Sequence, residues 1–536
     1  MNKNTENAQL YFGGDVYTVD VGRPGANAVA VKDGRIVAVG SDNECRAALG
    51  KECEPIDLRG RALLPGFIDT HLHPVLLAYF DMNVDLRGTS SIEEALDKMC
   101  DADRITAPEA WVVGLQYDEQ SMREPRLPTR HDLDAACPAH AAIVIKHDGH
   151  MVIANTKAIQ ISGVSAETGD PDGGVIDREP SGYPAGPFRE NAVPLILNAM
   201  PMPELQALID GAKLSFRKLN SKGITSIGAV MQTGEEGPAG TSGAFDVLAM
   251  EMFLEHVTVN LYGIIIASDI EKVHAARQSG LHQQEPGGHR IGAVKIFSDG
   301  TFGSCTAYMS EPFTDQPDKR GFLVASPEEI YRRMVAAHKE GLQIAIHAIG
   351  DLGNQTCIDL YKRLLGEYPR ADHRHRIEHA SVLSASMIAE MARLGLVVST
   401  QPLFIDSEKH WLHKRLGRDR AKWTYPFRSL LDAGVKVAGA SDGPVESLDV
   451  LHAIQCCVTR EGFEPQQCIT AAEAIRMFTL DAAYAQFEET VKGSITIGKR
   501  ADMVILNENP ARVPPDRIRD IRVERTIWGG KTVYEA

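Results

Sequence analysis

Apolar runs alternate with helical patterns through the middle of the chain. Eight runs have the length and composition of buried strands, at residues 62–73, 223–230, 258–266, 290–297, 343–349, 374–379, 397–401 and 435–440. Helical spacing fills most of the intervals, at residues 205–220, 327–340, 355–365 and 385–394. Strands that alternate with helices form parallel sheets, and eight such units close a (β/α)8 barrel, the TIM barrel. The pattern therefore predicts an α/β fold with this barrel over residues 62–492.

The two ends of the chain carry a different pattern of short strands and turns. Lys32-Asp-Gly34 separates two alternating apolar runs, which is typical of a β-hairpin. Near the C-terminus, residues 502–506 and 523–533 repeat this pattern around Gly529-Gly530. We predict that residues 1–61 and 493–536 together form a small composite β-sandwich domain.

The interval after the first barrel strand is far too long for a loop. Strand-to-helix connections in such folds usually have only about two to six residues. Residues 75–200 exceed that length many times over, so they must have structure of their own. We predict an inserted α/β subdomain over residues 80–200.

Composition narrows the class of protein. Hydrophobic residues make up 43% and charged residues 24%, which are ordinary globular values. The net charge of −16 argues against nucleic acid or an anionic membrane as a partner. The nine cysteines show no Cys-x-x-Cys spacing, and no signal peptide or membrane-spanning run is apparent. We expect a cytoplasmic protein that acts on a small molecule, and a homodimer stays open.

His71 and His73 end the first predicted strand. Residues two apart on a strand point to the same face, so both imidazoles aim at one place while Leu72 turns away. That arrangement suits a divalent transition metal. Taken alone, the pair has a second interpretation, which is two buried histidines bonded to backbone carbonyls.

Four further polar residues fall at strand ends. Lys295 lies near the end of the fourth predicted strand, His347 near the end of the fifth and His379 at the end of the sixth, and Asp442 follows the eighth. Active sites of TIM barrels form at this end of the strands, so all six side chains should converge. Alone, Lys295 would be expected to reach solvent, because a buried cation is costly. Beside four histidines, a ligand role is favoured.

These segments resemble the amidohydrolase superfamily over nearly the whole chain. The matching motifs are Pro65-Gly-Phe-Ile-Asp-Thr-His-Leu-His73, Val294-Lys-Ile-Phe-Ser-Asp-Gly300, Ile346-His-Ala-Ile-Gly-Asp351, Arg376-Ile-Glu-His379 and Ser441-Asp-Gly-Pro444. The chain looks most similar to the branch that contains N-substituted formamide deformylase. Within the insertion, Gly114–Asp118, Asp148-Gly-His150 and Asp172-Gly-Gly174 also resemble that branch.

The resemblance implies a binuclear centre of two zinc or other divalent ions. His71, His73 and Asp442 would bind the more buried ion, and His347 and His379 the more exposed one. The ions in such pairs lie about 3.5–4 Å apart, which suits them to share one hydroxide.

The resemblance further implies that carbon dioxide converts Lys295 into a carbamate, an anionic oxygen ligand long enough to bridge both ions. The metal-activated hydroxide would attack a carbonyl, with Asp442 first as base and then as acid for the leaving nitrogen. The activity that the resemblance implies is that of a hydrolase that cleaves a carbon–nitrogen bond other than a peptide bond, in an amide such as an N-substituted formamide. Asp442 has a compatible second role, as the N-cap of a helix.

Three residues are predicted to contact the substrate: His150, Asp299 and Tyr117. His150 would reach the carbonyl or its oxyanion from the insertion, and Tyr117 would form part of an apolar wall. Asp299 has a second interpretation, shared with Asp69 and Glu378, which is to orient a metal ligand.

Other functions compete for the same site. Ester, lactone or cyclic amide hydrolysis would use the same hydroxide. Mononuclear deaminases of this superfamily typically place a Glu three residues after the fifth-strand His and lack the bridging Lys, whereas this chain has Gly350 and Lys295. A non-catalytic scaffold would be expected to lose ligands, and none is missing.

Overall fold

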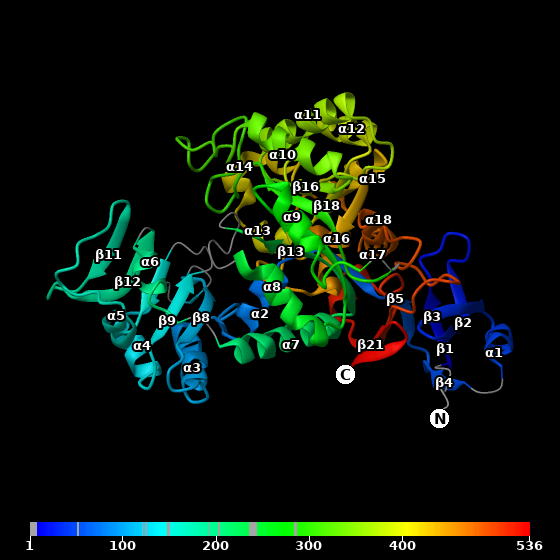
Figure 1. The fold of residues 1–536 in the computed structure, drawn as a ribbon, viewed down its shortest axis with the longest axis horizontal. Coiled ribbons are helices and arrows are strands. Elements are labelled where there is room, and N and C mark those ends of the chain that lie inside the picture. Colours follow the sequence, from blue (N-terminus) through cyan, green and yellow to red (C-terminus); the bar gives the residue numbers. More distant parts are fainter. Residues whose placement is uncertain are drawn as a thin grey trace. The chain divides into compact units, whose positions relative to one another are not determined.

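The computed structural model describes residues 8–50, 53–119, 122–123, 126–146, 151–190, 192–201, 204–234, 244–283 and 287–536. The chain forms two compact units, one of residues 1–76 with 215–536 and one of residues 77–214 (Figure 1). Among the described residues, no helix combines the length and the apolar character needed to span a bilayer.

The larger unit contains the predicted barrel. Its eight parallel strands pair in the order β6 (Phe67–Leu72), β13 (Ile224–Gln232), β14 (Asn260–Ile266), β15 (Arg290–Phe297), β16 (Gln343–Ala348), β17 (Arg376–His379), β18 (Val397–Thr400) and β19 (Lys436–Gly439). Most strand residues are buried, as expected for a parallel sheet that helices cover. The TIM barrel prediction is confirmed.

Hydrogen bonds link β6 and β19, the first and last strands of the barrel order. The Thr70 hydroxyl donates to the carbonyl of Gly439 (3.0 Å). Just beyond the strands, the Asp442 N–H donates to the His71 carbonyl and the His73 N–H donates to the Gly443 carbonyl, both at 2.8 Å. The barrel therefore closes beside the residues that carry the candidate chemistry.

Helices occupy the intervals between barrel strands. They are α7 (Leu205–Ser221), α8 (Asp246–Phe253), α9 (Ile270–Arg277), α10 (Pro327–Lys339), α11 (Asp351–Glu367), α12 (Ala385–Leu394), α13 (Leu403–Glu408), α14 (Leu412–Ala421) and α15 (Phe427–Asp432), followed by α16 (Val450–Thr459), α17 (Ala471–Met477) and α18 (Leu480–Ala485). Local signals set several boundaries. In α12, the Ser384 side chain accepts the Met387 N–H, and Gly395 ends the helix at φ +69°.

The segment predicted as one strand, 62–73, is two strands in different sheets. Residues Ala62–Pro65 form β5, which pairs with β1 (Ala8–Tyr17) and β20 (Met503–Leu506) rather than with the barrel. Gly66 separates the two strands, and a Cβ on it would lie only 2.3 Å from the Thr225 hydroxyl. The prediction of a barrel strand from residue 62 was therefore wrong over its first four residues, because an apolar run carries no signal for which sheet it joins.

Strands from both ends of the chain form the additional sheet. Its order is β22 (Lys531–Glu535), β21 (Val523–Trp528), β20, β5, β1, β2 (Gly25–Lys32) and β3 (Arg35–Gly40), with β4 (Glu54–Asp57) also on β1 and with α1 at Asp42–Leu49. The hairpin at Lys32-Asp-Gly34 is confirmed, since β2 and β3 pair antiparallel up to Lys32 and Arg35. This sheet includes β5, so it extends to Pro65.

The unit of residues 77–214 contains its own six-stranded sheet. The strand order is β11 (Gly174–Arg178), β12 (Pro184–Glu190), β10 (Met151–Ala154), β9 (Ala142–Lys146), β8 (Val112–Tyr117) and β7 (Val84–Asp85). Its helices are α3 (Ile92–Asp103), α4 (Arg130–Ala136), α5 (Thr156–Ile161) and α6 (Val193–Leu197), and α2 (Pro74–Asp81) leads into it. Two separate apolar clusters pack within this unit, so it has a core of its own.

Candidate active site

His71 and His73 both face one carboxylate. The Nε2 atoms of the two imidazoles each lie 3.3 Å from Oδ1 of Asp442, and all three side chains are buried. One ligand atom from each lies within 4.8 Å of the others, close enough to share a metal ion. Asp442 adopts φ +60°, a left-handed conformation that non-glycine residues rarely hold without a purpose.

Asp69 supports this arrangement from the same face of β6. One of its carboxylate oxygens accepts the backbone N–H groups of His71 and Ser441, each at 3.1 Å. Burial raises the pKa of Asp69 to about 7. The residue thus ties the end of β6 to the segment that carries Asp442.

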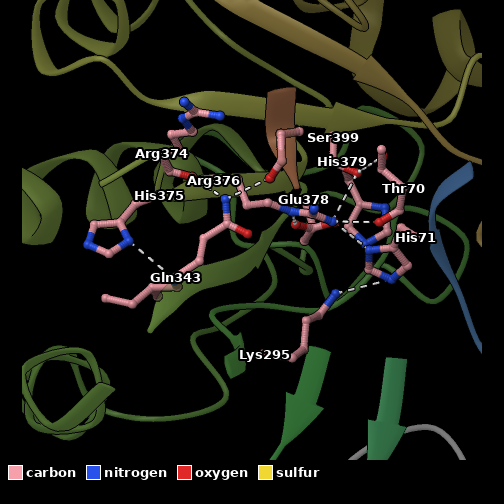
Figure 2. Close-up of polar contacts among 12 residues, drawn as sticks. Thr70, His71, Lys295, Gln343, Arg374, His375, Arg376, Glu378, His379 and Ser399 are labelled. Atoms are coloured by element: carbon pink, nitrogen blue, oxygen red, sulfur yellow. Dashed lines mark hydrogen bonds and ion pairs between the residues drawn. The ribbon is translucent and has the colours of Figure 1, made fainter. Parts of the chain in front are cut away.

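A buried ion pair orients His71. Its Nδ1 atom is hydrogen-bonded to Glu378, whose carboxylate is also held by the Arg376 guanidinium (Figure 2). Burial would raise the pKa of Glu378, but Arg376 and His71 hold it well below its usual range. Burial, together with Lys295, lowers the pKa of His71 to about 4. A neutral His71 that donates from Nδ1 has its lone pair on Nε2, which faces Asp442.

His347 and His379 form the neighbouring pair. Nε2 of His347 donates to the Gly300 carbonyl (3.1 Å), and Nδ1 of His379 donates to Oε1 of Gln401 (2.8 Å). Each ring therefore keeps one nitrogen with a free lone pair. The ring centroids lie 4.5 Å apart, and His379 lies 5.4 Å from the His71 ring. Burial lowers the pKa of His347 to about 3 and that of His379 well below its usual value.

Lys295 is buried among these histidines. Its Nζ lies 3.4 Å from Nε2 of His71 (Figure 2), and its side chain is only 1% exposed. Burial lowers the pKa of Lys295 to about 8, although Glu378 and Asp442 act in the opposite direction. The neutral amine is therefore far more populated than in an exposed lysine. The structure brings together all six side chains that the sequence singled out as ligands.

Asp299 turns toward the protein backbone. Its carboxylate accepts the N–H groups of Tyr308 (2.9 Å), Ile349 (3.1 Å) and Gly350 (2.8 Å), and burial raises its pKa to about 6. These bonds fix the loop that follows His347. These hydrogen bonds favour the second interpretation of Asp299, in which it helps to position a metal ligand, over direct contact with the substrate.

The other two predicted substrate contacts belong to the inserted segment. Tyr117 is fully buried in an apolar cluster of its own unit, and its hydroxyl donates to the Arg126 carbonyl (2.8 Å). This environment indicates packing. His150 lies outside the described residues.

Arg376 and Gln401 also support the site, although the sequence pattern alone does not predict a role for either residue. Arg376 also donates to the Thr70 carbonyl (2.7 Å), so it links β17 to β6 as well as to Glu378. A signal was present for both residues. Arg376 and Glu378 are opposite charges two apart on a buried strand, and Gln401 is an amide directly after one.

Comparisons with known proteins agree with this architecture. The sequence pattern described as the amidohydrolase family matches residues 54–534. A Bacillus subtilis protein named "Putative amidohydrolase YtcJ" is 30% identical, covering 98% of this chain and 99% of its own. The N-substituted formamide deformylase of Arthrobacter pascens is also 30% identical, covering 98% of each.

Solved structures give the same result. An uncharacterized metal-dependent hydrolase from Pyrococcus furiosus superimposes with a TM-score of 0.76 at 26% identity, over 94% of this chain and all of that one. The match of the family pattern extends from β4 to β22, and so covers the barrel, the insertion and five of the eight strands of the composite sheet. The chain therefore belongs to the amidohydrolase family.

Proposed function

We propose that this protein is a metal-dependent hydrolase that cleaves the carbon–nitrogen bond of an amide. One observation carries the proposal. Three histidines of the cluster are hydrogen-bonded through one ring nitrogen each, to Glu378, Gly300 and Gln401. The other ring nitrogen of each is thereby left available to bind a metal. Buried neutral imidazoles beside a carboxylate are the donor set that divalent transition metals prefer.

The donor set divides between two ions. His71, His73 and Asp442 would hold one, and His347 and His379 the other. Lys295 lies within reach of both groups, since its amine is 3.4 Å from His71 and the rings of His71 and His379 are 5.4 Å apart. As a carbamate, it would supply an oxygen to each ion.

Carbamate formation needs no further reactant than carbon dioxide. The neutral Nζ of Lys295 attacks the carbon, a nitrogen–carbon bond forms, and one proton leaves the nitrogen for solvent. Burial favours this reaction because it disfavours the protonated amine.

When bound, the two ions supply a water of lowered pKa and an electrophile for the carbonyl oxygen of the substrate. The residues of the chain move the protons. Asp442 accepts a proton from the attacking water at its carboxylate and returns it to the leaving nitrogen. Glu378 keeps the Nδ1 proton on His71, and Gln401 keeps the Nδ1 proton on His379, so that both rings hold their orientation through the reaction.

Aromatic rings beside the histidines favour an amide with an apolar substituent. The partly exposed Phe404 stacks on His379 with 6.3 Å between centroids, and the ring of Phe297 lies 5.5 Å from that of His347. The similarity to N-substituted formamide deformylase supports formamides of this kind as the first substrates to test.

The test begins with metal content per chain, measured on protein purified without chelator. We expect about two ions per chain and, by mass spectrometry under native conditions, the added mass of one carbon dioxide. N-benzylformamide, other N-acyl amines and lactones form the activity panel. If the protein hydrolyses lactones faster than every amide in the panel, the proposed amide activity is wrong and the protein is an esterase.

Two lysine variants give a matched comparison. Lys295→Met should lose at least one ion, the added mass and activity. Lys492 is equally buried but pairs with Glu488 away from the cluster, so Lys492→Met should keep all three. Full metal content and activity in Lys295→Met would contradict the bridged site, and zero or one ion in the wild type would contradict the binuclear centre.

A further inference from the structure

A second group of metal-type side chains lies on α16, outside the candidate active site. His452 and Cys456 are four residues apart, so they lie on the same face of the helix. Glu461 follows in the short 3-10 turn Arg460–Gly462. One ligand atom from each lies within 4.8 Å of the others. None of these residues takes part in the proposed amide hydrolysis.

His452 has an unsatisfied ring nitrogen in this group. Its Nε2 atom is buried and makes no hydrogen bond among the described residues, although Oδ2 of Asp406 lies 3.4 Å away. A buried polar atom without a partner typically costs about 1–3 kcal/mol, so native proteins seldom keep one without a reason. A bound cation would give this nitrogen a direct bond in place of its long contact with Asp406.

Negative charge surrounds the Cys456 thiol. The side chain is fully buried, and Asp406 and Glu461 lie close enough to add to the effect of burial in raising its pKa. Lys409 is the neighbouring cation, paired with Asp406 and 3.8 Å from Oε2 of Glu461. Two carboxylates thus face one ammonium, one thiol and one imidazole.

We propose that His452, Cys456 and Glu461 form a second, independent site for a zinc-type divalent ion, with Asp406 as its fourth ligand. Nitrogen, sulfur and oxygen donors in this combination are typical zinc ligands. Tetrahedral bonding at the usual lengths separates ligand atoms by about 3.3–3.8 Å, so small side-chain rotations suffice. Binding releases the thiol proton to solvent and displaces the Lys409 ammonium from the carboxylates.

The location gives this ion a structural role. Asp406 belongs to α13, which follows β18, and the other ligands belong to or follow α16, which comes after β19. The two helices pack against each other. An ion between them would fasten the segments that follow Gln401 and Asp442. The exposed fraction of the Asp406 side chain, 32%, leaves a route for the ion to enter.

Cobalt provides a probe that separates the two sites. The full-length chain is stripped with chelator and titrated with Co²⁺, and the near-ultraviolet absorption of a thiolate–cobalt bond is followed. The ligands of the candidate active site include no cysteine, and the comparison of Cys456→Ser with Cys457→Ser assigns the band to Cys456 rather than to another of the nine free cysteines. We expect the band in the wild type, its loss in Cys456→Ser, and its retention in Cys457→Ser, the neighbouring buried cysteine.

Two further variants keep the test decisive if Cys456→Ser fails to fold. Glu461→Gln should weaken the Co²⁺ affinity at least tenfold. Lys409→Gln should strengthen it, because it removes a competing cation. The proposal is overturned if millimolar Co²⁺ produces no such band in the wild type, if the band survives in Cys456→Ser, or if both charge variants leave the affinity unchanged. Failure of the active-site assignment would not affect these outcomes.

Discussion

The chain contains two His-x-His motifs with opposite environments. His71-Leu-His73 lies at the C-terminal end of the first barrel strand, and both Nε2 atoms face Asp442. His373-Arg-His375 precedes β17, at the other end of the barrel. There, Nδ1 of His373 accepts the His375 N–H (2.9 Å) and its Nε2 donates to the Leu394 carbonyl (2.9 Å).

The second motif continues into a chain of hydrogen bonds. Nδ1 of His375 accepts the Ile344 N–H (3.0 Å), and its Nε2 donates to Nδ1 of His338 (2.8 Å). Nε2 of His338 then donates to the Tyr368 carbonyl (3.0 Å). Burial lowers the pKa of all three histidines, as it does for His71. Burial and a lowered pKa are therefore common to His71 and the second group. The distinguishing feature is a ring nitrogen of His71, Nε2, that faces Asp442 and Lys295 instead of a backbone group or another histidine.

The largest predicted effect is a loss of metal affinity and activity when the first His-x-His motif is mutated, but not when the second one is. His71→Ala removes a proposed metal ligand and should lower both metal affinity and amide hydrolysis more than about 100-fold, beyond the loss usual for outer-shell residues. His373→Ala should keep metal content and activity while the protein becomes less stable. Metal analysis and turnover of both purified variants check this. Equal loss of metal in the two variants would remove the distinction.

A smaller loss of metal affinity is expected when a mutation disturbs only the orientation of a metal ligand. Gln401→Met keeps a similar volume but removes the acceptor for Nδ1 of His379. The metal affinity should fall about 10–100-fold, as is usual for outer-shell partners. Competition with a chelator measures it, and thermal unfolding verifies that the variant is folded. An unchanged affinity would mean that His379 does not need Gln401.

Mutation of the histidine group at the other end of the barrel should lower the stability of the protein without changing its metal content. His338→Leu leaves the Nε2 donor of His375 without its acceptor, at a cost of about 1–3 kcal/mol. Urea unfolding measures the change, and metal content should stay at the wild-type value. Loss of metal without loss of stability would contradict a purely structural role for this group.

The last prediction concerns the pH dependence of stability. Burial lowers the pKa of the three histidines in the fold, whereas in the unfolded chain they take up protons as the pH falls below about 6.5. Their contribution to stability is therefore complete above that pH and is lost below it, by at most about 1.4 kcal/mol per pH unit for each group. Urea unfolding at pH 7.5 and 5.5 should show the decline.

His338→Leu serves as the comparison for this measurement. The difference in unfolding free energy between the two pH values should be smaller in the variant, because one proton-binding group is gone. An identical difference in variant and wild type would show that His338 does not contribute.

The same comparison shows what sequence patterns determine. The periodicity of apolar residues predicted seven of the barrel strands and, within the segment 62–73, the remaining strand β6. It could do so because buried parallel strands are continuous apolar runs. It also brought His71, His347 and Asp442 to one end of the barrel, because chain direction decides which end a residue occupies. Spacing could not separate His71-Leu-His73 from His373-Arg-His375. Hydrogen-bond partners distant in sequence make that difference.

Two other features could not be predicted from the sequence for the same reason, namely that their partners are distant in the chain. Asp299 lies in a segment that resembles a motif of the family, but its carboxylate accepts hydrogen bonds from the backbone of Tyr308 and of the segment after His347. Ala62–Pro65 has the composition of a barrel strand, and its neighbour β20 lies near the far end of the chain. In both cases the outcome depends on partners that local composition does not specify.

The position of β5 also governs how the protein is made. This strand pairs with β1 on one edge, but its other partner, β20, leaves the ribosome only after the whole barrel has been synthesised. Until then, one edge of an apolar strand stays open directly before the first barrel strand. Completion of this sheet therefore waits until β20 has been synthesised, and a chain released before Met503 would carry an open strand edge of the kind that promotes aggregation.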